Sequence, residues 1–81
     1  MVKIGLSCTI RKGVTIGNRY SNDNVTTIGD NVNIGTGAVI IGKISIGNNV
    51  RIGANAVVLE NVPNNQIAIG VPANILPIKK R

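Results

Sequence analysis

Hydrophobic residues recur along this chain with a period of six. Isoleucine occupies positions 28, 34, 40, 46 and 52, and glycine directly follows four of these five isoleucines. The register reaches back to Ile4, Ile10 and Ile16 and forward to Val58. A small or branched residue lies four positions after each central isoleucine, at Val32, Ala38, Ile44, Val50 and Ala56. A fixed short period of this kind is the signature of a repeat architecture.

Each hexad predicts one short strand and one corner. Alternate side chains of a strand face opposite ways, so the isoleucine points inward, and glycine or asparagine suits a corner with left-handed backbone. The asparagines expected at corners are Asn31, Asn48, Asn49 and Asn55. Three hexads close a triangular coil, and stacked coils pair as parallel sheets. We therefore predict an all-β fold, a parallel β-helix of about three coils, in which residues 1–81 form one domain.

Alternative folds disagree with the pattern. A helical stripe at i, i+3 and i+4 is missing, and helix interiors do not tolerate this density of glycine. Collagen requires glycine at every third position together with much proline.

Residues 18–27, NRYSNDNVTT, interrupt the hydrophobic pattern without shifting its register. One explanation is an irregular hexad with Asn22 in the inward position. The other, which we favour because a buried asparagine is costly without partners, is a loop extruded from a corner. Polar loops on rigid scaffolds are common sites of substrate contact.

The repeat ends near residue 62, where residues 61–66 bring a proline and three further asparagines. Residues 63–81 are predicted to cap the stack and to end as a basic tail. Pro72 and Pro77 each remove a ladder donor, so the segment VPANILPI at 71–78 cannot be a central strand.

The core must be built from isoleucine and valine, since the chain is 43% hydrophobic but has no Phe or Trp. Cys8 is the single cysteine, so no disulfide forms within the chain, and we interpret it as a small core or corner residue. Histidine is absent, which excludes histidine-based metal sites, and no metal cofactor is predicted. No apolar run reaches the length of a membrane span. A cytoplasmic protein without membrane contact is the default prediction.

The formal net charge is +6, and basic residues gather only at Lys79, Lys80 and Arg81. Such a tail is either a solvated terminus or a contact for a phosphate-bearing ligand. Nucleic acid is a weaker hypothesis, because aromatic residues for base stacking are missing.

The sequence as a whole resembles the hexapeptide-repeat acyltransferases, most closely the serine acetyltransferase and sugar O-acetyltransferase branch. The segments that carry this resemblance are IRKGVTIG at 10–17, IGTGAVIIGKISIG at 34–47, IGANAVVLENVP at 52–63 and IGVPANIL at 69–76. The resemblance implies a left-handed β-helix, a homotrimer, and acetyl-CoA bound in the groove between neighbouring subunits.

The resemblance also implies cofactor contacts. Thr36 and Ala54 match the small residues that let the pantetheine arm approach the coils, and Asn18 is a further match at the base of the loop. Arg51 stands where relatives often carry a basic residue near the cofactor. The segment Gly70, Val71, Pro72 and Ala73 is similar to the part that contacts the adenine end. Asn74 replaces a frequent Lys or Arg, and Lys79 and Lys80 are predicted to substitute for it.

The catalytic base of the family is a histidine, which this chain lacks. The resemblance places that histidine in a coil upstream of residue 10, so the chain resembles only the C-terminal, cofactor-binding part. Asp23, Asp30 and Glu60 are its only carboxylates, and we assign no catalytic residue. We expect a truncated acetyltransferase-like protein that transfers acetyl from acetyl-CoA to a hydroxyl of an amino acid or sugar, or that keeps only trimerisation and CoA binding. The alternative is a non-catalytic β-helix scaffold.

An uncovered first coil is a further expectation. Ile4, Ile10 and Ile16 would line an apolar end, and repeat proteins need covered ends for solubility. We expect another copy, for example a second trimer stacked head to head, or a partner chain to cover this end.

Overall fold

The computed structural model describes residues 2–17 and 26–78, which contain eleven short strands and no helix. No helix in these two ranges could therefore cross a membrane. Asn18, Lys79 and Lys80 lie outside the described residues, as do most of the predicted loop and the basic tail. The strands are β1 (Val2–Ile4), β2 (Thr9–Ile10), β3 (Thr15–Gly17), β4 (Thr26–Ile28), β5 (Asn33–Ile34), β6 (Val39–Ile41), β7 (Ser45–Ile46), β8 (Arg51–Ile52), β9 (Val57–Val58), β10 (Gln66–Ile69) and β11 (Asn74–Pro77).

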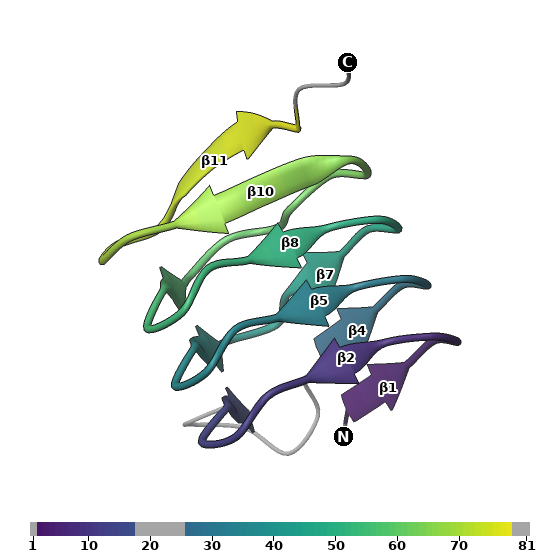
Figure 1. Cartoon of the computed structure of the whole chain (residues 1–81), viewed down its shortest axis with the longest axis horizontal. Helices are drawn as coiled ribbons and strands as arrows, with labels where there is room; N and C mark the ends of the chain where they lie inside the picture. Colours follow the sequence, from purple (N-terminus) through teal and green to yellow (C-terminus); the bar gives the residue numbers. More distant parts are fainter. Residues whose placement is uncertain (1, 18–25, 79–81) are drawn as a thin grey trace.

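Three sheets form the sides of a triangular prism (Figure 1). One side is β1-β4-β7, the second is β11-β10-β8-β5-β2, and the third is β3-β6-β9. Each coil contributes one strand to each side, and all pairings between coils are parallel. The described residues thus form three coils and the beginning of a fourth at β10, as the hexads predict.

The pairing register shows where the coils differ in length. Ile28 pairs with Ile46 and is eighteen residues from it, which is three hexads. Ile4 pairs with Ile28 instead of with residue 22, so the first coil carries six additional residues. Ile28 therefore continues the column that begins at Ile4. Asn22, the inward residue of the alternative hypothesis, lies outside the described residues.

The predicted loop ends earlier than residue 27. Thr26 and Thr27 belong to β4, and Thr26 is buried. The Thr26 hydroxyl donates a hydrogen bond of 3.0 Å to the carbonyl oxygen of Gly42, which satisfies this polar group inside the coil. A polar residue that finds such a partner can be buried at little cost, which the sequence pattern did not indicate.

The core consists of aligned columns of aliphatic side chains. Every isoleucine of the central ladder is 3% exposed or less. The columns are Ile28–Ile46–Val62, Ile34–Ile52–Ala68 and Ile40–Val58, and Val32, Val50, Ala38, Ala56 and Ile44 fill the corners between them. Because the columns run between coils, each coil is stabilised mainly by its neighbours.

Two different positions of each hexad shape the corner, one by its left-handed backbone and the other by its small size. Positive φ falls three residues after the isoleucine, at Ser7, Asn31, Asn49 and Asn55 and at Gly13 and Gly37. The glycine directly after the isoleucine is needed for a different reason, which is close approach of the next coil. A Cβ on Gly29 would lie 2.8 Å from the carbonyl carbon of Gly47. Asn48, expected in the left-handed conformation, instead accepts a hydrogen bond from the Asp30 amide through its side chain at 2.8 Å.

We expect Gly29→Ala to destabilise the stack strongly, whereas Gly17→Ala should be nearly neutral. The added methyl group at Gly29 meets backbone atoms that cannot rotate away, and overpacking of this kind costs about 1–3 kcal/mol or more. A methyl group at Gly17 meets no atom of the described residues within 4 Å. Chemical denaturation followed by circular dichroism measures both variants. Equal stability of the two would contradict the close approach of the coils.

The C-terminal residues close the five-stranded side. Ala68 pairs with Ile52 at an offset of sixteen residues, so β10 continues the column despite the break at 61–66. β11 then pairs antiparallel with β10 and forms the edge of this sheet. An edge position is what Pro77 allows, since proline has no amide proton for a further strand.

The opposite end of the prism exposes apolar side chains. Ile4 is 48% exposed, Ile10 41% and Leu6 76%. These residues belong to the first coil or to its corner, and the equivalent isoleucines of the next coil are buried.

Candidate functional site

Small residues from successive coils line one edge of the prism, between the five-stranded sheet and the β3-β6-β9 sheet. By the pairing register, Thr36, Ala54 and Gly70 occupy equivalent positions in consecutive coils, and all three are exposed. A Cβ on Gly35 would lie 2.6 Å from the Ala54 amide nitrogen, so these corners are in direct contact. We call Thr36, Ala54 and the segment Gly70–Ala73 the small-residue edge.

Local turn chemistry explains this edge. Ala38 N donates to Gly35 O, and Ala56 N donates to Gly53 O, which closes two β-turns. Their third residues, Gly37 and Asn55, have positive φ, as a type II turn requires. Thr36 and Ala54 are the second residues of these turns, so their short side chains stand at the outermost point of the corner.

The segment Gly70–Ala73 is held against the last coil. Val57 N donates to Gly70 O at 3.0 Å, and Ala73 N donates to Val57 O at 2.9 Å. The Val71–Pro72 peptide bond is cis, and the Val71 side chain is 71% exposed. The segment therefore continues the small-residue edge and adds an apolar surface to it.

Arg51 lies on the outer face of the five-stranded sheet, beside this edge. It precedes the inward Ile52 on β8, and its backbone pairs with that of Asn33 on β5. A shallow hollow of about 250 Å³ joins Arg51 and Asn33 to Gly35, Gly53 and Ile67. The fold thus gathers Thr36, Ala54 and Gly70–Ala73 on one edge and places Arg51 on the adjoining face. Their role in cofactor binding stays a prediction.

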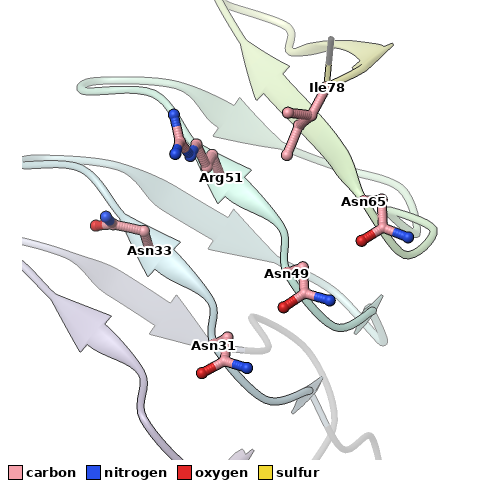
Figure 2. Close-up of a pocket in the computed structure, with 6 residues that line it drawn as sticks. All are labelled: Asn31, Asn33, Asn49, Arg51, Asn65 and Ile78. Carbon is pink, nitrogen blue, oxygen red and sulfur yellow. The ribbon is translucent and has the colours of Figure 1, made fainter. Parts of the chain in front are cut away.

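A second hollow, of about 380 Å³, occupies the opposite border of the same sheet. Asparagine side chains from three successive corners line it, as Figure 2 shows, together with two residues of the sheet face and one that follows β11. Its lining residues are Asn31, Asn49, Asn65, Asn33, Arg51 and Ile78. We call this hollow the asparagine groove.

The sequence analysis missed this groove. Asn31 and Asn49 are eighteen residues apart and were expected at corners, but Asn65 lies sixteen residues after Asn49, inside the segment where the repeat breaks. The hydrogen bond from Asn65 N to Asn48 O shows that Asn65 continues the column. The last coil is two residues shorter than three hexads, and recognising this from the sequence would have placed Asn65 in the same column as Asn49.

The nucleophilic and acidic side chains of the described residues do not form a catalytic cluster. The Asp30 carboxylate accepts a hydrogen bond from Leu6 N at 2.8 Å, and Glu60 is exposed on another corner. The Cys8 thiol contacts the carbonyl oxygen of Gly29 at 3.1 Å. Within 2–17 and 26–78, no three His, Cys, Asp or Glu side chains gather around a common point.

Comparison with known proteins agrees with the repeat and the fold. Residues 25–60 match the family model described as bacterial transferase hexapeptide (six repeats). The chain belongs to the hexapeptide-repeat transferase family. The colanic acid biosynthesis acetyltransferase WcaB of Escherichia coli strain K12 is 46% identical over 80 residues, which are 96% of this chain and 49% of WcaB. A serine acetyltransferase of Staphylococcus xylosus is 43% identical over 91% of this chain and 35% of its own length.

A solved structure of a serine acetyltransferase in complex with cysteine superposes with a TM-score of 0.80. It is 44% identical and covers 85% of this chain and 30% of the enzyme chain. The predicted fold, a left-handed parallel β-helix, and the predicted family are therefore confirmed. The chain spans between about a third and a half of the length of the curated relatives it matches.

Proposed function

We propose that this chain is the cofactor-binding part of an acetyltransferase that moves acetyl from acetyl-CoA to a hydroxyl of an amino acid or sugar. The observation that carries the proposal is the small-residue edge, which continues from Thr36 through Ala54 to Gly70 and Ala73. The activities named for the relatives, serine acetyltransferase and colanic acid biosynthesis acetyltransferase, support the reaction class.

The shape of this edge suits a thin, extended cofactor. Backbone at consecutive corners is separated by about 4.8 Å, and side chains no larger than threonine leave it accessible. A pantetheine arm could therefore lie along the edge and pair its amides with corner backbone. Arg51 on the adjoining face offers a cation for a phosphate, and the exposed Val71 offers an apolar surface for the adenine ring. We assign Asn18, Lys79 and Lys80 as further contacts from the family resemblance alone.

The chain itself supplies binding rather than proton transfer. In acetyl transfer the acceptor oxygen attacks the thioester carbon, the C–S bond breaks, and a base takes the hydroxyl proton. A base of near-neutral pKa is needed, and residues 1–81 contain no histidine. The base would come from outside these residues. The alternative function is a non-catalytic scaffold in which the β-helix provides only an assembly surface.

Oligomerisation belongs to the same proposal. The outer face of the β3-β6-β9 sheet is apolar, with Val39, Ile41 and Val57 half-buried and Leu59 57% exposed. We propose that this face packs against a neighbouring copy in a cytoplasmic homotrimer. The edge would then border the cleft between two subunits.

Calorimetric titration with CoA tests the binding step. We expect saturable heat and a rise in melting temperature, because a ligand that binds only the folded state stabilises it by mass action. No heat and no thermal shift at millimolar CoA would remove cofactor binding and leave the scaffold. Turnover of acetyl-CoA, with serine and several sugars as acceptors, then separates binding from catalysis.

The exposed first coil leads to an expectation about assembly. We propose that a second copy covers Ile4, Leu6 and Ile10, so light scattering should show a mass above that of one trimer. Leu6→Lys should return the assembly to the trimer, since it places a charge in the apolar contact. A single trimer with an ordered first coil in the unaltered protein would contradict the stacking.

A further inference from the structure

We propose that the asparagine groove binds the anionic group and hydroxyls of an acidic sugar. The groove lies on the border of the five-stranded sheet opposite to the small-residue edge, and Arg51 is the one described residue that it shares with the proposed cofactor site. Its volume of about 380 Å³ falls in the range of small-molecule sites, about 300–1,000 Å³.

Two ladders of polar residues follow this corner, and only the inner one is structural. Leu6 N donates to the Asp30 carboxylate, Asp30 N to the Asn48 side chain, and Asn48 N to the Asn64 side chain, at 2.8, 2.8 and 2.6 Å. Each side-chain oxygen accepts a hydrogen bond from a backbone amide of the preceding coil and so links two neighbouring coils. The inner ladder is therefore committed to the fold.

The outer ladder comes one residue later, at Asn31, Asn49 and Asn65. Its backbone amides are committed, since Asn31 N donates to Leu6 O, Asn49 N to Asp30 O and Asn65 N to Asn48 O. The three side chains make no hydrogen bond to the described parts of the chain, and all three residues are exposed. Figure 2 shows their amides repeating along the border of the groove. Each amide offers one acceptor and two donors to a ligand.

Backbone conformation alone does not account for this outer ladder. Glycine adopts positive φ without strain, and the neighbouring corner has Gly13, Gly37 and Asn55 at the equivalent positions of its three coils, so only its third coil uses asparagine. The groove corner has asparagine in three consecutive coils instead. The amide groups are therefore available for a second purpose, which is hydrogen bonding to a molecule outside the chain.

The other lining residues indicate the chemistry of the ligand. Arg51 lines the groove, and neither Asp30 nor Glu60 does, so the charge of the described lining residues favours an anion. Stacked amides about 4.8 Å apart suit a ligand with several hydroxyls. Ile78 adds an apolar surface, against which the C–H face of a sugar ring can pack. A carboxylate or a phosphate on a sugar satisfies all three requirements.

Amide chemical shifts in ¹⁵N–¹H spectra test this proposal without CoA present. Glucuronate, glucose 6-phosphate, glucose and inorganic phosphate are titrated separately to about 50 mM. We expect glucuronate or glucose 6-phosphate to shift the amides of Asn49, Arg51 and Asn65 saturably, with glucose and phosphate at least about fivefold weaker. The stronger of the two sugars identifies carboxylate or phosphate as the preferred group. Shifts by phosphate as strong as those by both sugars would indicate nonspecific anion binding and overturn the proposal.

A matched pair of variants separates recognition from folding. Asn49→Gly keeps the left-handed corner and removes one amide of the groove, and we expect it to weaken sugar binding at least about fivefold. Asn55→Gly makes the same change at a corner outside the groove and should leave sugar binding unchanged. Circular dichroism shows whether both variants stay folded. Equal affinity of the two variants, or no saturable shift with either acidic sugar, would overturn the assignment. If the unaltered protein does not bind CoA, that result contradicts the proposed acetyl transfer and not the proposed sugar binding.

Discussion

Ile46→Asp is expected to unfold the protein. The Ile46 side chain is 2% exposed and lies in a column between Ile28 and Val62, so the carboxylate would have no water and no cation within the column. Burial of an unpaired charge is among the few single changes that cost more than about 4 kcal/mol. Small domains have roughly 5–15 kcal/mol in total, so the variant should lose its cooperative transition. Circular dichroism with thermal melting measures this loss.

Ser45→Asp provides the matched control for that variant. Ser45 is the adjacent residue on β7, and its exposed side chain points to the opposite face of the strand. A charge there stays hydrated, and we expect the melting temperature to change by only a few degrees. A folded Ile46→Asp protein, or two variants that melt alike, would show that β7 does not have the observed inward and outward faces.

Ala54→Leu is expected to remove CoA binding while the fold persists. Ala54 is the middle residue of the small-residue edge and is exposed, so three additional carbons project into the proposed path of the pantetheine arm. We expect the dissociation constant measured by calorimetry to rise at least about tenfold, which corresponds to about 1.4 kcal/mol. The melting temperature without ligand should stay close to that of the unaltered protein, because the core columns are untouched.

Glu60→Leu controls for the added apolar surface. Glu60 follows Val58 by two residues, as Ala54 follows Ile52, so it occupies the equivalent position on a different corner. It is exposed and does not belong to the small-residue edge. We expect this variant to bind CoA normally. Normal binding by Ala54→Leu as well would mean that the cofactor site lies elsewhere.

The repeat made the central part of the fold predictable. Ile28, Ile34, Ile40, Ile46 and Ile52 were all expected to point inward, and all are buried. The same register gave the three-sided coil, since a strand period of two and a hexad repeat leave one geometry for the inward residues. Thr36 and Ala54 were matched to cofactor-facing residues by the family resemblance, and the structure stacks them in consecutive coils.

Prediction was weaker where the coil length changes. Thr26 and Thr27 were assigned to a loop because they are polar, whereas the Gly42 carbonyl allows Thr26 to be buried in a strand. The glycines after each isoleucine were associated with left-handed corners, but at Gly29 the constraint is contact with the next coil. Both errors concern partners that are distant in the chain, about which a local pattern carries no information.

The sequence by itself therefore determined the coil, its inward columns and the family, because every hexad repeats one local rule. Only the tertiary structure decided which hexads lie above one another. The six additional residues before β4 leave the hexad register intact, and the two missing residues before β10 shift it by an even number that keeps the alternation of inward and outward side chains. Neither change can therefore be placed in the stack from a six-residue period alone. That stacking brings Asn31, Asn49 and Asn65 to one corner and Thr36, Ala54 and Gly70 to another, with Arg51 on the face between them. Both candidate sites are thus products of the pairing between coils, where backbone hydrogen bonds and close glycine contacts set the register.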